Sequence, residues 1–253
     1  MTSLPAKPAA RRMGLVIDLD TCVGCQACVV HCKEWNTSST ASPLADTDPY
    51  GLEPSGAWLN RVHGFELDDL TDTADTSGGC GRTVHFPRSC LHCENAACVT
   101  VCPTGASYKR AEDGIVLVDE DKCIGCGLCA WACPYGAREM DGVAKVMKKC
   151  TLCIDRIYNE HLPAEEREPA CVRTCPAKAR HFGDLGDPDS AVSRLVAERE
   201  GVPLMPDLGY APTNRYLPPR RRPAGTAADA PQPAALEPAP GGFLGWLDRA
   251  LSD

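Results

Sequence analysis

Cysteine is the residue type in this chain whose number and spacing most directly imply chemistry. Sixteen of its 17 cysteines fall into four quartets. Two quartets have the spacing C-x2-C-x2-C-x3-C, which sets three thiolates around one cubane iron-sulfur cluster and turns the fourth away. The sixteen are Cys22, Cys25, Cys28 and Cys32; Cys90, Cys93, Cys98 and Cys102; Cys123, Cys126, Cys129 and Cys133; and Cys150, Cys153, Cys171 and Cys175. Four quartets predict four clusters, and clusters in series form a path for electrons.

The ends of the quartets predict how they combine. Three quartets end in Cys-Pro, at Cys102, Cys133 and Cys175, whereas the first continues with Lys33. Cys-Pro-Thr-Gly-Ala at the second end repeats as Cys-Pro-Tyr-Gly-Ala at the third. In two-cluster ferredoxins the last cysteine of one half ligates the cluster of the other half. The first and fourth quartets are therefore predicted to form one ferredoxin-like module, with the second and third forming another nested inside it.

Disulfides and structural zinc are the alternatives for so many cysteines. A disulfide framework is typical of short secreted domains, but the apolar stretch after Arg11-Arg12 ends at Asp18, too early for a secretory signal. Structural zinc sites use two separated pairs of ligands, without a third cysteine three residues on. Iron-sulfur clusters are the favoured interpretation. Cys80, the seventeenth cysteine, is expected to be a spectator, and none of the six histidines is expected to be a ligand.

Charge and composition exclude other classes. A formal net charge of -8 gives no support to nucleic-acid binding. No run approaches the ~18 apolar residues of a membrane span. The 22 glycines and 22 prolines predict a loop-rich fold that its clusters hold together. No nucleophile with a paired base is evident, so no catalytic residue is assigned. Basic residues near the last quartet, Lys145, Lys148, Lys149 and Arg156, are expected to form a solvated face. The alternatives are that they raise cluster potentials or bind an acidic face of a partner.

Short elements are expected to position the quartets. The predicted strands include 15–17 and 114–119, the predicted helices are 29–35, 154–160 and 190–200, and 58–67 pairs with 83–87 as a hairpin around an acidic loop at 68–82. In chain order we expect a disordered leader (1–12), an outer module (13–35 plus 140–185), an insertion (36–89), an inner module (90–139), an extension (186–217), a Pro/Ala linker (218–240) and a short amphipathic tail (241–253). The predicted fold class is α+β: two nested ferredoxin-like modules of the bacterial 2[4Fe-4S] type with loop-rich insertions.

The motifs around the quartets resemble a known family. The segments that carry the resemblance are CVGCQACVVHCKEWNT (22–37), HFPRSCLHC (85–93), PTGASYKR (103–110) and KVMKKCTLCIDRI (145–157). Over residues 13–217 the chain resembles the four-cluster electron-transfer subunits of molybdenum oxidoreductases of the dimethyl sulfoxide reductase type. Within that family it is most similar to the iron-sulfur subunits of cytoplasmic, quinone-linked sulfite dehydrogenases.

The resemblance implies four [4Fe-4S] clusters with crossed ligands. Some relatives carry a tryptophan and a three-iron cluster where this chain has Cys126, so all four clusters are expected to be cubanes. The implied ligand sets are Cys22, Cys25, Cys28 and Cys175 for cluster 1; Cys32, Cys150, Cys153 and Cys171 for cluster 2; Cys90, Cys93, Cys98 and Cys133 for cluster 3; and Cys102, Cys123, Cys126 and Cys129 for cluster 4.

The resemblance also implies partners. Cluster 1 would face a molybdopterin-containing catalytic subunit, and cluster 4 an integral-membrane, quinone-reactive anchor that holds the chain peripherally on the cytoplasmic face of the membrane. The expected function is electron relay in the oxidation of sulfite to sulfate. The alternatives are the same role in a dimethyl sulfoxide, polysulfide or thiosulfate reductase or a formate dehydrogenase complex, or a free polyferredoxin carrier. The family pattern contains no counterpart of the tail, and the acidic loop is longer than the pattern requires.

Overall fold

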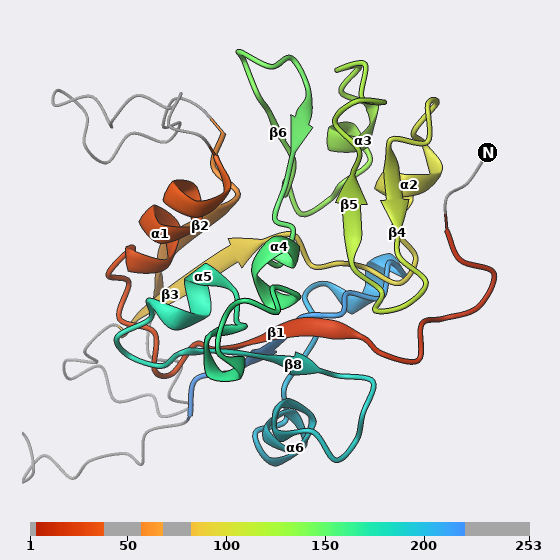
Figure 1. Ribbon diagram of the computed structural model, residues 1–253. Helices are drawn as coiled ribbons and strands as arrows, with labels where there is room; N and C mark the ends of the chain where they lie inside the picture. The colour runs from red at the N-terminus through yellow and green to blue at the C-terminus, as the bar shows by residue number, and fades with distance from the viewer. Residues whose placement is uncertain (1–3, 38–56, 68–81, 221–253) are drawn as a thin grey trace, which may run out of the picture. The chain divides into compact units, whose positions relative to one another are not determined.

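The computed structural model describes residues 4–37, 57–67 and 82–220, which form short helices and strands joined by long loops (Figure 1). The elements are β1 (Met13–Asp18), α1 (Ala27–Asn36), β2 (Asn60–Leu67), β3 (Arg82–Ser89), α2 (Ala97–Thr100), β4 (Ser107–Lys109), β5 (Val116–Val118), α3 (Leu128–Trp131), β6 (Glu139–Met140), β7 (Met147–Lys148), α4 (Ile154–Ile157), the 3-10 turn η1 (Ala164–Glu166), α5 (Ala170–Arg173), β8 (Arg180–Asp184), α6 (Ala191–Glu198), η2 (Pro206–Leu208) and β9 (Arg215–Leu217). Cys80, nearly all of the acidic loop and the tail lie outside the described residues. None of the described helices has the length and hydropathy needed to cross a bilayer.

A three-stranded sheet in the order β8-β1-β9 joins distant parts of the chain. All six residues of β1 are buried, as its continuous apolar run predicts. β8 pairs with β1 in antiparallel orientation, and β9 pairs with its other edge in parallel. Helix α6 packs on this sheet, where Val192 joins Val16 and Leu217 in a small core. The sheet therefore places the residues just before the first quartet beside those just after the fourth.

The helices that carry cysteines pack in two pairs. Helix α1, from the first quartet, contacts α5, from the fourth. Helix α2, from the second quartet, contacts α3, from the third. A short antiparallel ladder, β4 with β5, lies between the second and third quartets in the chain. Helices of the first and fourth quartets therefore pack together, and so do helices of the second and third quartets.

Several elements confirm the sequence predictions, and one corrects them. The predicted hairpin exists: β2 and β3 pair over their full length, from Asn60 opposite Ser89 onward (Figure 1). The predicted helices at 29–35 and 190–200 are α1 and α6, and the strand at 114–119 contains β5. The helix predicted over 154–160 was too long, because α4 ends at Ile157. The Asn159 side chain accepts a hydrogen bond from the His161 amide, forming a local turn that competes with helix.

The main core is small and contains thiols. Leu15, Leu91, Ile115 and Leu152 are at most 1 % exposed. The same buried cluster includes Cys28, Cys90, Cys150 and Cys171. Because these cysteines lie inside the core, their chemistry and the stability of the fold are coupled.

Candidate metal centres

Backbone amides point at cysteine sulfurs in several loops. The amides of Ser107, Met147 and Ala179 donate to the Sγ atoms of Cys102, Cys123 and Cys175 at 3.4, 3.4 and 3.3 Å. Such N–H donors stabilise negative charge on sulfur and lower the cost of gathering thiolates at one site.

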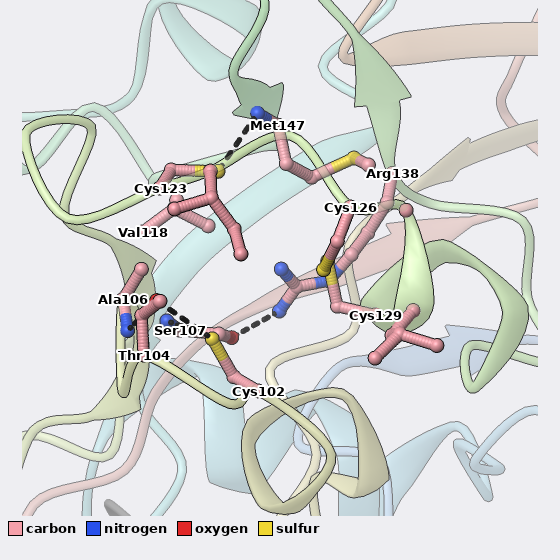
Figure 2. Close-up of a pocket in the computed structure, with 13 residues that line it drawn as sticks. Cys102, Thr104, Ala106, Ser107, Val118, Cys123, Cys126, Cys129, Arg138 and Met147 are labelled. Carbon is pink, nitrogen blue, oxygen red and sulfur yellow. Dashed lines mark hydrogen bonds between the residues drawn. The ribbon is translucent and has the colours of Figure 1, made fainter.

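One pocket gathers four cysteines from two quartets. Cys102 of the second quartet lines it together with Cys123, Cys126 and Cys129 of the third. Figure 2 shows the Arg138 side chain reaching into this pocket, where its Nη2 donates to Ser107 Oγ at 2.8 Å. The pocket is otherwise lined mainly by apolar side chains such as Val118 and Met147. We call these four cysteines thiol group 4.

A second pocket gathers cysteines from the two ends of the sequence. Cys22, Cys25 and Cys28 line it together with Cys175, and we call these four thiol group 1. The β2–β3 hairpin contributes to the wall through Val62 and Pro87, which face each other across the ladder. Gln26 Nε2 fixes the loop to the hairpin by donating to the Val62 carbonyl at 3.1 Å.

The remaining eight cysteines form two further groups. Burial raises the pKa of Cys32 well above its ordinary value, and the neighbouring Cys150, Cys171 and Cys153 raise it further; these four are thiol group 2. Asn36 Nδ2 donates to both Cys32 Sγ and Cys153 Sγ, at 3.7 and 3.5 Å. Burial likewise raises the pKa of Cys93, with further contributions from its neighbours. With those neighbours it forms thiol group 3: Cys90, Cys93, Cys98 and Cys133.

The four groups follow one another in a row. Burial raises the pKa of Cys171 to about 11, and Cys28 of group 1 is close enough to raise it further. Burial also raises the pKa of Cys150 to about 12, with an added contribution from Cys90 of group 3. Groups 3 and 4 share Arg138, which opposes the rise that burial causes in the pKa of both Cys98 and Cys129. Group 1 is therefore a neighbour of group 2, group 2 of group 3, and group 3 of group 4.

The donor chemistry fits cubane clusters better than single metal ions. Within the described residues, no three His, Cys, Asp or Glu side chains converge as one bound ion requires. The thiols instead surround pockets that carry N–H donors, and a cubane takes one thiolate at each of four separate irons. Burial raises the pKa of several thiols, as at Cys150 and Cys171, so metal binding must displace their protons. His92, buried beside Cys93, accepts a hydrogen bond from the Val116 amide at Nδ1, which is a structural role.

The structure corrects the expectation of a solvated basic face. Lys145 is exposed, but Lys149 and Arg156 are buried. Lys149 Nζ donates to the Cys150 carbonyl at 2.6 Å, and the Arg156 guanidinium lies over the Trp35 ring. Sequence reasoning also missed two buried arginines, Arg138 and Arg180. Each stands five residues after the last cysteine of the third or fourth quartet, whereas the second quartet has Ser107 at this position. This shared position is a signal that could have found the two arginines.

Comparisons with known proteins agree with this chemistry. Residues 82–185 match the family described as 4Fe-4S dicluster domain, and residues 19–35 match the 4Fe-4S binding domain. The chain therefore contains ferredoxin-type iron-sulfur domains.

Full-length relatives define the family more closely. The sulfite dehydrogenase B subunit of Allochromatium vinosum is 59% identical over 210 residues, 83% of this chain and 84% of that protein. The polysulfide reductase B subunit of Wolinella succinogenes is 36% identical over 84% of this chain and 97% of its own length. The tetrathionate reductase B subunit of Salmonella typhimurium is 35% identical, covering 81% and 72%. This protein belongs to the family of iron-sulfur electron-transfer subunits of dimethyl-sulfoxide-reductase-type molybdoenzyme complexes.

Proposed function

We propose that this chain holds four [4Fe-4S] clusters, one on each thiol group, within two nested ferredoxin-like modules. The pairing of β1 with β8 and of α1 with α5 supports an outer module, and the contact of α2 with α3 supports an inner one. When bound, each cluster accepts and releases one electron. The sixteen cysteines provide the ligands, amide N–H groups hold charge on the sulfurs, and apolar walls exclude water.

The exposure of the cysteines supports a relay with two ends. Among the described cysteines only Cys25 and Cys126 are exposed, and they belong to groups 1 and 4, the two ends of the row. Exposed apolar residues lie close to each in the sequence: Val23 and Val30 near Cys25, and Ile124, Leu128 and Trp131 near Cys126. Exposed apolar patches on such a protein mark protein interaction sites. Groups 2 and 3 lie between these ends and are suited to internal transfer.

We infer partners and substrate from this arrangement together with the family. Group 1 would face a molybdopterin-containing catalytic subunit, and group 4 a quinone-reactive membrane anchor that keeps the chain peripheral on the cytoplasmic side. The substrate of the complex would be sulfite, oxidised to sulfate with electrons passed to quinone. The observation that carries the substrate is the 59% identity with the sulfite dehydrogenase relative, compared with 36% for the polysulfide reductase relative.

The test is to purify the native complex through this chain and assay sulfite-dependent quinone reduction. We expect activity with sulfite, co-purification of a catalytic and an anchor subunit, and about 16 iron atoms per chain, four for each cubane. Reduction of sulfoxide or polysulfide without sulfite oxidation would assign the chain to a reductase complex. A single species at the monomer mass, without partners, would indicate a free carrier.

A further inference from the structure

Within the described residues, three buried cations lie between neighbouring thiol groups without carboxylate partners. A fourth buried cation, Arg156, lies over the Trp35 ring and acts on Cys153 of group 2. Arg180, Lys149 and Arg138 are 3 %, 3 % and 7 % exposed, and within the described residues none of them forms an ion pair. Among the described oxygen acceptors, Arg180 donates to Asn60 Oδ1 and Arg138 donates to Ser107 Oγ, and both guanidinium groups keep Nη1 without such a partner. A buried charge is strongly unfavourable unless an opposite charge compensates it. The negative charge that compensates these cations must therefore come from neighbouring groups other than carboxylates.

Arg180 lies between thiol groups 1 and 2. It lines the pocket of group 1, and its charge counters the rise that burial causes in the pKa of Cys22. It also opposes the burial-driven rise in the pKa of Cys171, a member of group 2. One guanidinium therefore acts on both groups.

Arg138 occupies the equivalent place between groups 3 and 4. It reaches into the pocket of group 4 (Figure 2), where it counters the burial-driven rise in the pKa of Cys129. It acts in the same sense on Cys98 of group 3. Arg138 follows Cys133 by five residues, as Arg180 follows Cys175, so the two modules place the same residue type at the same point of the repeat.

Lys149 lies at the remaining junction. It immediately precedes Cys150 of group 2 and opposes the burial-driven rise in the pKa of that thiol. It also opposes the corresponding rise at Cys98 of group 3. Each junction between successive groups thus contains one buried cation: Arg180, then Lys149, then Arg138.

We propose that these three cations compensate the charge of adjacent clusters, each raising the reduction potential of the two clusters that flank it. This inference rests on the proposed four-cluster function. Reduction of a cluster adds one electron and therefore one negative charge at the site. A fixed positive charge in a dry interior favours that reduced state, because Coulomb interactions are strong there. Hydrogen bonding and charge around a cluster are among the protein's means of setting its potential.

The test is a redox titration, followed by electron paramagnetic resonance, of the full-length chain purified anaerobically with its clusters. In Arg138→Gln we expect the reduction equilibria of clusters 3 and 4 to shift about tenfold toward the oxidised form, ~59 mV more negative for a one-electron couple. Clusters 1 and 2 should keep their potentials. Arg180→Gln should instead lower the reduction potentials of clusters 1 and 2 and leave those of clusters 3 and 4 unchanged.

Three controls separate charge from structure. Arg138→Lys retains the positive charge, so the reduction potentials of clusters 3 and 4 should stay close to those of the unaltered chain. Arg215→Gln removes a half-buried arginine that donates to the backbone carbonyls of Pro212, Thr213 and Asn214, and should shift no cluster. If Arg138→Gln does not load iron, Lys149→Met applies the same test to clusters 2 and 3.

The outcomes are distinct. Unchanged potentials in a fully loaded Arg138→Gln chain, or an equal shift of all four clusters, would overturn the role of the cation. Iron content is measured first on the unaltered chain. A value far below about 16 iron atoms per chain would instead contradict the four-cluster function itself.

Discussion

At the scale of single residues, two glycines shape the loops that present cysteines. Gly24 and Gly125 each precede the second cysteine of their quartet, with φ of +69° and +67°. A Cβ at Gly24 would lie 2.5 Å from the His85 ring, and one at Gly125 would collide with the Lys145 carbonyl oxygen. Both positions therefore require glycine for conformation and for space. Gly127 also has a positive φ, of +77°, but a Cβ there meets nothing within 4 Å.

This contrast predicts different results for two matched substitutions. Gly127→Ala should cost only the left-handed strain, about 1–2 kcal/mol of unfolding free energy, and retain its iron. Gly125→Ala bears the same strain and a collision with backbone, so we expect it to lose about one cluster's iron and more stability. Iron analysis and thermal unfolding measure both effects. Equal losses in the two variants would show that the close approach to Lys145 is unimportant.

At the scale of elements, strand β9 ties the extension to the rest of the fold. Asn214, just before β9, is 0 % exposed. Its Oδ1 accepts from the Leu15 amide at 2.9 Å, and its Nδ2 donates to the Cys90 carbonyl at 3.1 Å. The Asn214 side chain thus connects strand β1 with the loop that carries the second quartet.

We therefore expect Asn214→Leu to be strongly destabilising. The substitution leaves the Leu15 N–H and the Cys90 C=O buried without partners, and each unsatisfied group costs about 1–3 kcal/mol. The control is Asn95→Ala, which removes an exposed hydrogen bond to the Gly209 carbonyl and should cost about 1 kcal/mol or less. Chemical unfolding of the reconstituted chain compares the two. If Asn214→Leu lowers the free energy of unfolding no more than Asn95→Ala does, the Asn214 side chain does not have this connecting role.

The elements also explain which parts of the fold sequence reasoning can predict. Local patterns were sufficient for β1, the hairpin, α1 and α6, because apolar runs and turn residues determine them. Strand β9 was missed because its three residues carry no pattern of their own. It forms by pairing with β1, about 200 positions earlier, and single-sequence reasoning does not reveal such a contact.

The candidate site, like the fold, could be predicted from the sequence only in part. Cysteine spacing was sufficient to identify the sixteen candidate ligands, since ligand chemistry depends on residue type and interval. The buried cations were not predicted, because a lysine or arginine in a sequence is usually solvated. Lys149 shows the difficulty: its neighbour Lys148 pairs with Glu120 near the surface, while Lys149 itself is buried. Only the packing of the loops separates the two.

At the scale of the whole molecule, the row of thiol groups has two different exposed ends. The end at group 4 includes Trp131, which is 90 % exposed and lies in α3 together with Cys129. An exposed tryptophan of this kind is costly to leave in water and is a frequent binding hot spot. We expect it to contact the membrane anchor, whereas Val23 and Val30 at the other end contact the catalytic subunit.

Trp131→Ser tests this assignment of the two ends. The side chain is 90 % exposed, so folding and iron content should be unchanged, while affinity for the anchor should fall by about 2 kcal/mol or more, roughly 30-fold in Kd. Affinity purification through the catalytic subunit should then recover this chain at normal yield but little anchor. Val202→Ser, an exposed apolar residue that belongs to neither end, is the matched control. If Trp131→Ser releases the catalytic subunit and retains the anchor, the two ends are assigned in the wrong order. If it releases neither, the group 4 end is not an interface, and the exposure of Cys126 requires another explanation.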